Sequence, residues 1–259
     1  MVDPLPATSP RVAAIAVGNE LLSGKVTDLN LTYAVKELRA LGASVVLAIL
    51  VPDTLEAIGD ALRYSLERAE HVFTTGGVGP THDDITVAAV ARALGRELVR
   101  DAALEQAIRD WYGAHVNEDV LRMADVPAGA NLERDGAFFL PLAGLTVGEK
   151  SVHWLPGEPN HFKRQFDRWK KRFEGTRPFA LARVYLDVDE GEIARDLREV
   201  ENLHTVAIGS YPKYDQDAKA AGYRVLVTIE SKDRAAVEAA LRDLLGRLKP
   251  GRLLRTQIS

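Results

Sequence analysis

The chain has 259 residues, enough for one large domain or two unequal ones. Its 33 Lys and Arg against 37 Asp and Glu give a formal charge of −4, which argues against a general nucleic-acid binder. The absence of Cys excludes disulfides, zinc–thiolate sites, iron–sulfur clusters and cysteine nucleophiles, and no run approaches the roughly 18 to 20 apolar residues of a membrane span.

The N-terminal residues 1–10 are rich in proline and lack the basic start of a signal peptide, so they are predicted to be a disordered lead-in. Together with the composition, this predicts a soluble, cytoplasmic protein that binds neither nucleic acid nor membrane. The next part of the chain alternates short apolar runs with segments that carry apolar residues on one helical face. Strands are predicted at 12–17, 44–51 and 71–75, with helices at 29–41, 55–68 and 83–94.

This alternation is typical of a doubly wound, three-layer α/β sheet, in which ligands lie outside the carboxyl ends of the strands. The unusual residues, at 18–28, 52–53 and 76–86, all fall at those ends. Further on, a helix is predicted at 101–113, loops and short strands at 126–148, a strand at 152–155 and a basic helix at 159–173.

A turn-rich segment at 174–178 marks the predicted domain boundary, between an α/β domain at 11–174 and a small domain at 178–255. The small domain is predicted to be an α+β module of the order βαββα. Its elements are expected at 179–188 (strand), 190–200 (helix), 204–210 and 223–231 (strands) and 234–248 (helix).

A glycine-rich loop follows the third predicted strand and opens a helix. Glycine accepts the positive φ angles that a cradle of backbone N–H groups requires, and a helix N-terminus favours an anion. The loop therefore predicts a phosphate or pyrophosphate site, although a tight strand-to-helix turn would use the same glycines. The residues in question are Thr75, Gly76, Gly77, Gly79, Pro80 and Thr81.

Carboxylates surround this loop at the predicted strand ends. Acidic groups repel a polyanion unless a cation intervenes, and hard divalent metals use such oxygen ligands to bridge to phosphates. The pattern predicts a metal-assisted reaction at a phosphate, whereas helix capping, by Asp53 or Thr54 and by Asp83 or Asp84, is the alternative. The acids are Glu20, Asp28, Asp53, Asp83 and Asp84.

Three further residues are weaker candidates for contact with a ligand. Lys25 and His82 could each contact a phosphate or lie free in solvent, and Gly157 lies in a strand-end turn that either closes over a ligand or only reverses the chain. Asn30 is predicted to cap the first long helix.

The sequence contains two distinctive motifs: Val17-Gly18-Asn19-Glu20-Leu21-Leu22-Ser23-Gly24-Lys25, with Asp28 after it, and Thr74-Thr75-Gly76-Gly77-Val78-Gly79-Pro80-Thr81-His82-Asp83-Asp84-Ile85-Thr86. Both resemble motifs of the molybdopterin-binding (MoaB/MogA-like) fold. The second has the form found in the competence- and damage-inducible CinA proteins and in the N-terminal domain of eukaryotic FAD synthase. The segment at 208–212, Ile-Gly-Ser-Tyr-Pro, resembles the FAD-synthase branch in particular.

The resemblance implies a homo-oligomer, a dimer or a trimer, and a site that takes a nucleotide diphosphate or a pterin. It implies catalytic roles for Asp53 and Asp84 and a metal site of Glu20, Asp53 and Asp84. The metal would be magnesium, manganese or cobalt, with potassium as an activator. Ligand contacts are implied for Gly18, Asn19, Glu20, Thr75, Gly76, Gly77, Gly79, Pro80, Thr81 and Asp83.

The expected function is metal-dependent hydrolysis of a nucleotide diphosphate such as ADP-ribose or FAD, with release of AMP. Because the chain ends at Ser259 without a deamidase or synthase domain, deamidation and FAD synthesis are not expected from it. One alternative is a molybdenum-cofactor biosynthesis protein that binds or adenylylates molybdopterin. The other is a nucleotide- or pterin-binding module without catalytic activity, because fold alone does not fix function.

Overall fold

The structure, a computed structural model, describes residues 9–134 and 138–259. These residues form two compact units, 9–176 and 177–259. Residues 1–8 of the predicted lead-in lie outside the described part, whereas Ser9 is buried in the first unit. No helix in the described residues is long and apolar enough to cross a membrane.

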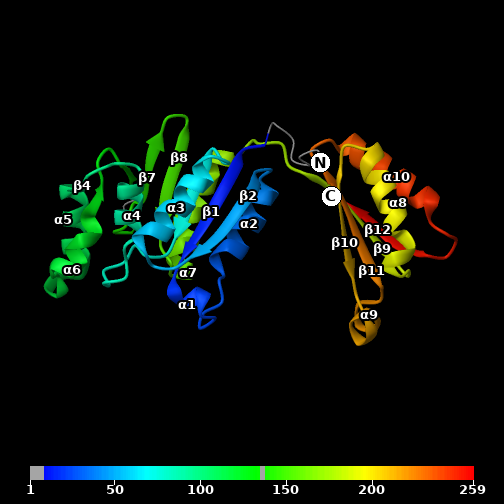
Figure 1. The fold of residues 1–259 in the computed structure, drawn as a ribbon, viewed down its shortest axis with the longest axis horizontal. Coiled ribbons are helices and arrows are strands. Elements are labelled where there is room, and N and C mark those ends of the chain that lie inside the picture. The colour runs from blue at the N-terminus through cyan, green and yellow to red at the C-terminus, as the bar shows by residue number, and fades with distance from the viewer. Residues whose placement is uncertain (1–8, 135–137) are drawn as a thin grey trace. The chain divides into compact units, whose positions relative to one another are not determined.

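A six-stranded sheet forms the centre of the first unit, in the order β2-β1-β3-β8-β7-β6 (Figure 1). The strands from β2 to β8 are parallel, and β7 and β6 continue the sheet in antiparallel fashion. Because β2 and β3 lie on opposite sides of β1, the chain reverses its direction of winding next to β1. The bounds are β1 Arg11–Val17, β2 Ser44–Val51, β3 His71–Thr75, β6 Asn131–Glu133, β7 Leu142–Val147 and β8 Lys150–Leu155.

Helices cover both faces of this sheet. On β1, Ala13, Ile15 and Val17 pack in one buried cluster with helix α3 (Leu55–Leu66) and helix α4 (Thr86–Ala93). The alternate residues Val12, Ala14 and Ala16 pack on the other face, with α2 (Asn30–Ala40) and α7 (Pro159–Trp169). The two-residue period of a strand therefore places one apolar run in two cores. The predicted three-layer α/β fold is confirmed.

Several elements of the first unit differ from the prediction. Helix α4 begins at Thr86, not at residue 83, because Asp84 bonds to Thr81 in a turn before the helix. The segment at 98–127 contains a small antiparallel pair that was not predicted, β4 (Leu98–Arg100) and β5 (Asp125–Pro127). The other elements are α1 Asn19–Leu22, α5 Ala102–Tyr112, α6 Glu118–Leu121 and the 3-10 turns η1 Gly113–His115, η2 Arg122–Ala124 and η3 Lys170–Phe173.

The second unit is a four-stranded antiparallel sheet in the order β10-β11-β9-β12. Helices α8 and α10 pack against one face of it, whose buried side chains alternate along β9 and β11. The predicted order βαββα is incomplete, because the structure adds helix α9 between β10 and β11 and the edge strand β12. The bounds are β9 Ala180–Leu186, α8 Glu190–Leu203, β10 Ala207–Pro212, α9 Asp215–Ala221, β11 Val225–Ser231, α10 Arg234–Arg247 and β12 Leu253–Ile258.

A buried histidine makes the first unit sensitive to acid. His153 on β8 lies 7% exposed among Trp169, His71 and the guanidinium of Arg172, whose Nη1 is 3.2 Å from His153 Nε2. Burial, with the positive charge of Arg172 and the nearby His71, lowers the pKa of His153 from 6.5 to about 3. The folded domain therefore keeps this ring neutral under conditions in which the unfolded chain is protonated.

We expect the free energy of unfolding to fall as the pH drops from 6.5 toward 3. Over this range the unfolded chain binds a proton at residue 153 that the folded domain does not, at a cost of about 1.4 kcal/mol per pH unit. All three Trp residues lie in the first unit, so urea unfolding followed by Trp fluorescence measures this effect. His153→Asn should flatten the profile over this range, and parallel profiles for the two proteins would contradict the assignment.

Candidate functional site

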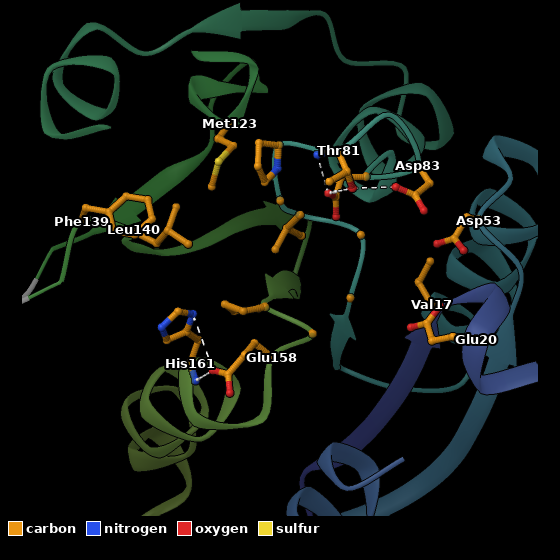
Figure 2. A pocket seen from close by; sticks show the side chains of 18 of the residues that line it. Val17, Glu20, Asp53, Thr81, Asp83, Met123, Phe139, Leu140, Glu158 and His161 are labelled. Carbon is orange, nitrogen blue, oxygen red and sulfur yellow. Dashed lines mark hydrogen bonds and ion pairs between the residues drawn. The ribbon is translucent and has the colours of Figure 1, made fainter. Parts of the chain in front are cut away.

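A cavity of about 510 Å³ opens at the carboxyl ends of β1, β3 and β8 and next to the loop after β2 (Figure 2). This is the edge of a parallel sheet at which the winding reverses, where such sheets bind ligands. Its described lining residues are Val17, Glu20, Asp53, Gly76, Gly77, Val78, Gly79, Pro80, Thr81, Asp83, Asp84, Trp111, Tyr112, Met123, Phe139, Leu140, Pro156, Gly157, Glu158 and His161.

Two glycines of the loop after β3 hold conformations that other residues rarely adopt. Gly76 has a φ of +98° and Gly77 a φ of +67°. A Cβ atom on Gly76 would overlap the carbonyl oxygen of Val17, and one on Gly77 would overlap the hydroxyl of Thr86. That hydroxyl donates a 2.8 Å hydrogen bond to the carbonyl of Gly76, which fixes the loop against the start of α4. The sequence therefore requires glycine here for close packing as well as for φ.

A buried amide holds this loop against the neighbouring one. Nδ2 of Asn30 lies 2.9 Å from Oγ1 of Thr75 and 2.9 Å from the carbonyl oxygen of Gly157. The Thr75 hydroxyl in turn donates to the carbonyl of Pro156 at 2.8 Å. The prediction that Asn30 caps α2 is wrong, because the first turn is capped by Asp28, whose Oδ1 accepts from the backbone N–H of Leu31 at 2.7 Å. Asn30 instead joins the two loops that form the floor of the cavity.

We expect Asn30→Ala to lower the free energy of unfolding by about 1–3 kcal/mol, because the substitution leaves a buried hydroxyl and a carbonyl without their donor. Asn131→Ala, an exposed asparagine on β6, is the matched control. Urea unfolding monitored by Trp fluorescence compares the two variants. Equal stability of both would show that the Asn30 bridge contributes little.

Four acids from three separate segments line the cavity: Glu20 on α1, Asp53 after β2, and Asp83 and Asp84 before α4. Figure 2 shows Glu20, Asp53 and Asp83 on one side of it. The capping alternative does not account for them. Thr54, not Asp53, caps α3, with Oγ1 accepting from the backbone N–H of Ala57 at 3.3 Å. Neither Asp83 nor Asp84 caps α4, whose N-cap residue makes no side-chain bond.

Three of these acids, Asp53, Asp83 and Asp84, are held by hydrogen bonds. Asp53 Oδ2 accepts from the backbone N–H of Asn19 at 2.7 Å, so it fixes the start of α1. Asp84 Oδ2 accepts from the backbone N–H of Thr81 at 2.8 Å and lies 2.5 Å from its hydroxyl. That hydroxyl also lies 2.6 Å from Asp83 Oδ1, and this hydrogen bond lowers the pKa of Asp83. Asp83 is therefore ionised at neutral pH.

The carboxylates of two of these acids lie over glycine backbone. A Cβ on Gly79 would come within 2.8 Å of Asp84 Oδ2, and one on Gly18 within 2.8 Å of Glu20 Oε2. Glycine at these two positions thus leaves room for the acids beside the loop. Gly18 itself has an extended backbone, so the reason for glycine there is space and not φ.

On the opposite rim, Glu158 accepts from the backbone N–H of His161 at 2.7 Å, which lowers the pKa of Glu158. With Glu158, five carboxylates line the cavity, and no Lys or Arg is among the described lining residues. A ligand with several negative charges would be repelled from such a rim without a cation to bridge the two.

The carboxylates of the cavity fit an open metal site and not a closed one. No group of three or more His, Asp or Glu in the described residues is placed to hold a metal by itself. Mg²⁺ is usually bound through one or two carboxylates, with water and substrate phosphates as its other ligands. The carboxylates of Glu20 and Asp84, beside the glycine loop, fit this open kind of site and not a closed cage.

Not all of the predicted residues lie in the cavity. Thr75 and Asp28 line a small adjoining cavity of about 80 Å³. Gly18 lies against the Glu20 carboxylate, and the backbone N–H of Asn19 donates to Asp53. Lys25 is exposed outside both cavities. The side chain of His82 is 94% exposed and outside both cavities as well. The cavity does bring together Glu20, Asp53, Gly76, Gly77, Gly79, Pro80, Thr81, Asp83, Asp84 and Gly157.

The sequence interpretation missed the apolar side of the cavity. Trp111 and Tyr112 end helix α5, Met123 lies in η2, and Phe139 and Leu140 precede β7. Figure 2 shows Met123, Phe139 and Leu140 on the other side of the loop from Glu20, Asp53 and Asp83. The paired aromatics at 111–112 and 138–139 were the available signal, but nothing in the sequence indicates that they meet.

The protein is therefore of the α/β class, with a cavity of small-molecule size at the carboxyl ends of its parallel strands. A family model described as a probable molybdopterin binding domain matches residues 13–174, and one described as the middle domain of FAD synthase matches residues 178–257. The chain belongs to the molybdopterin-binding domain family, and its MoaB/MogA-like fold is the one predicted from the sequence.

Relatives of this chain are CinA-like. A CinA-like protein of Syntrophus aciditrophicus is 31% identical over 248 residues, which cover 90% of this chain and 57% of that protein. A protein of Aeropyrum pernix is 32% identical over 240 residues, 89% of this chain and 90% of the relative. The crystal structure of CinA from Thermoplasma acidophilum, a protein described there as of unknown function, covers 64% of this chain and 99% of that one. It is 31% identical, with a TM-score of 0.61.

Proposed function

We propose that the protein is a divalent-metal-dependent hydrolase of nucleotide diphosphates that releases AMP from ADP-ribose or FAD. The observation that carries the proposal is the pairing, in one cavity, of a tight glycine loop with carboxylates from three segments, with no Lys or Arg among the lining residues that the structure describes. The glycine loop supplies backbone N–H groups to an anion. The carboxylates supply oxygen donors for a metal that neutralises that anion.

The residues of this chain would do four things. The backbone of 76–79 would hold the diphosphate, and the carboxylates of Glu20 and Asp84 would hold the metal together with that diphosphate. Asp53 would position the start of α1, which carries Glu20. The apolar wall would exclude bulk water from that side of the ligand. A bound divalent metal supplies charge neutralisation at the diphosphate and activation of a water.

In the reaction, a water oxygen forms a bond to one phosphorus while the bridging P–O bond breaks. The proton of the water passes to solvent, and both products leave as phosphate monoesters, one of them AMP. Binding alone does not require carboxylates in the cavity that contains the glycine loop, as those of Glu20 and Asp84 are. This arrangement therefore supports hydrolysis over a binding module without catalysis.

The second candidate is binding or adenylylation of molybdopterin, and the description of the family model over 13–174 favours it. A planar pterin with a phosphate would use the same loop and the same apolar wall. This reaction would consume ATP and the pterin together and would release pyrophosphate, whereas the hydrolase needs only water and the nucleotide diphosphate.

The test is product analysis of the purified chain incubated with ADP-ribose or FAD. Mg²⁺, Mn²⁺ and Co²⁺ are supplied in turn, each with K⁺, and EDTA replaces the metal in a parallel sample. AMP that forms only with metal supports the proposal. If no metal yields AMP from either compound while ATP and molybdopterin are converted, the second candidate replaces the first.

A further inference from the structure

The apolar wall of the cavity contains a pair of parallel aromatic rings that the proposed hydrolysis does not use. The rings of Trp111 and Phe139 stack with their centroids 4.9 Å apart and their planes 22° apart. Both side chains line the cavity that contains the glycine loop. We call this pair the aromatic shelf.

Neighbouring rings fix the orientation of the shelf. Phe138 meets Trp111 edge-on, with centroids 6.0 Å apart, and contacts Phe139 at 5.0 Å. Tyr112 meets Phe139 at 89° and 5.7 Å, and His161 lies 4.7 Å from Phe138. Edge-to-face contacts of this kind favour one relative arrangement of the rings. A ligand would therefore meet a surface that is already positioned, which lowers the entropic cost of binding.

Trp111 exposes an unusual amount of apolar surface. Its side chain is 58% exposed, whereas Trp154 is 6% exposed and Trp169 is fully buried. An exposed indole inside a cavity, held by other rings instead of being folded into the core, is a surface that a flat ligand can cover. A heterocycle that stacks on such a ring stabilises binding substantially, and this contribution depends little on which heterocycle it is.

We propose that the aromatic shelf binds the planar heterocycle of the ligand, so that Trp111 is the residue that selects diphosphates with a flat ring over ring-free ones. This inference rests on the proposed function for the position of the diphosphate, on the glycine loop. Glu20, Asp53 and Asp83 lie on the other side of that loop from Phe139, so one extended ligand can reach both sides (Figure 2). The heterocycle occupies the apolar side, and the charged and hydroxylated part occupies the acidic side.

The test measures binding and not turnover. Isothermal titration calorimetry in the presence of Mg²⁺ measures the affinity for two compounds. The methylene-bridged analogue of ADP carries a heterocyclic ring, and methylenediphosphonate does not. The variants are Trp111→Leu, Trp111→Phe and, as a matched control, Tyr64→Leu, which removes a 48% exposed aromatic ring on α3 away from the cavity.

We expect Trp111→Leu to lower the affinity for the ADP analogue by about tenfold or more and to leave the affinity for methylenediphosphonate unchanged. Trp111→Phe should keep most of the affinity, and Tyr64→Leu all of it. The proposal is overturned if Trp111→Leu weakens both compounds equally, if it weakens neither, or if the wild-type protein binds both with the same affinity. None of these results depends on AMP release, so failure of the hydrolase proposal is recognised separately.

Discussion

Replacement of Asp84 by Asn is expected to reduce the metal-dependent release of AMP by about 100-fold or more. Asp84 has one oxygen engaged by Thr81 and lies against the backbone of Gly79, where the proposed diphosphate binds. Loss of its charge removes a metal ligand and leaves the rim less able to hold the cation that the anionic substrate needs. The measurement is kcat/KM for ADP-ribose and for FAD at saturating Mg²⁺.

The substitution is a conservative one for the fold. The Oδ1 atom of an Asn side chain can still accept from the backbone N–H of Thr81, the bond that Asp84 makes at 2.8 Å. Asp60→Asn is the matched control, because Asp60 is an exposed α3 aspartate paired with Arg63 and is not among the cavity's lining residues. If Asp84→Asn turns over as fast as Asp60→Asn, the role assigned to Asp84 is wrong.

The sequence was sufficient for the parallel strands of the first unit because they carry a strong signal. Residues 12–17 are an uninterrupted apolar run, which is typical of a strand covered on both faces, and the structure buries all six. The glycines at 76 and 77 mark the end of β3 because positive φ angles exclude most other residues. Local patterns of this kind survive folding because burial and backbone geometry are decided within a few residues.

Strands at the sheet edges and other short elements carry no comparable pattern in the sequence. All six residues of β12 are exposed, so Leu253 and Ile258 follow no alternation that a strand prediction could use. The pair β4–β5 joins residues 98–100 to 125–127 across the α5–α6 segment, a pairing that depends on tertiary contact and not on local pattern. The short helix α9, between two strands, likewise has no apolar face long enough to be recognised.

The candidate site, too, could be predicted from the sequence only in part. The positions of the acids follow from the ends of parallel strands, but their roles did not, because an acid before a helix is equally a cap. The structure removes that ambiguity for Asp53, since Thr54 takes the capping position. The aromatic shelf joins positions 111 and 139, which lie on different elements, and only the folded chain brings them together.

Gly76→Ala is expected to lower the free energy of unfolding of the first unit by about 2–5 kcal/mol. A left-handed backbone costs a non-glycine residue about 1–2 kcal/mol, and the added methyl group would also overlap the Val17 carbonyl oxygen, at a cost of about 1–3 kcal/mol. The loop has little freedom to move away. The backbone N–H of Gly76 donates to the carbonyl of Leu155 at 3.1 Å, and the carbonyl of Gly76 accepts from the Thr86 hydroxyl at 2.8 Å.

Gly95→Ala separates the two contributions. Gly95 has a φ of +63° after α4, and no atom lies within 4 Å of the position that a Cβ would take, so only the backbone cost applies. Urea unfolding followed by Trp fluorescence should show a smaller loss for Gly95→Ala than for Gly76→Ala. Where Gly76→Ala still folds, binding of methylenediphosphonate should also weaken, because the backbone N–H groups of the loop shift with it. Equal losses of stability for the two variants would show that the close approach of β1 and the glycine loop, on which the proposed phosphate site depends, is not tightly constrained.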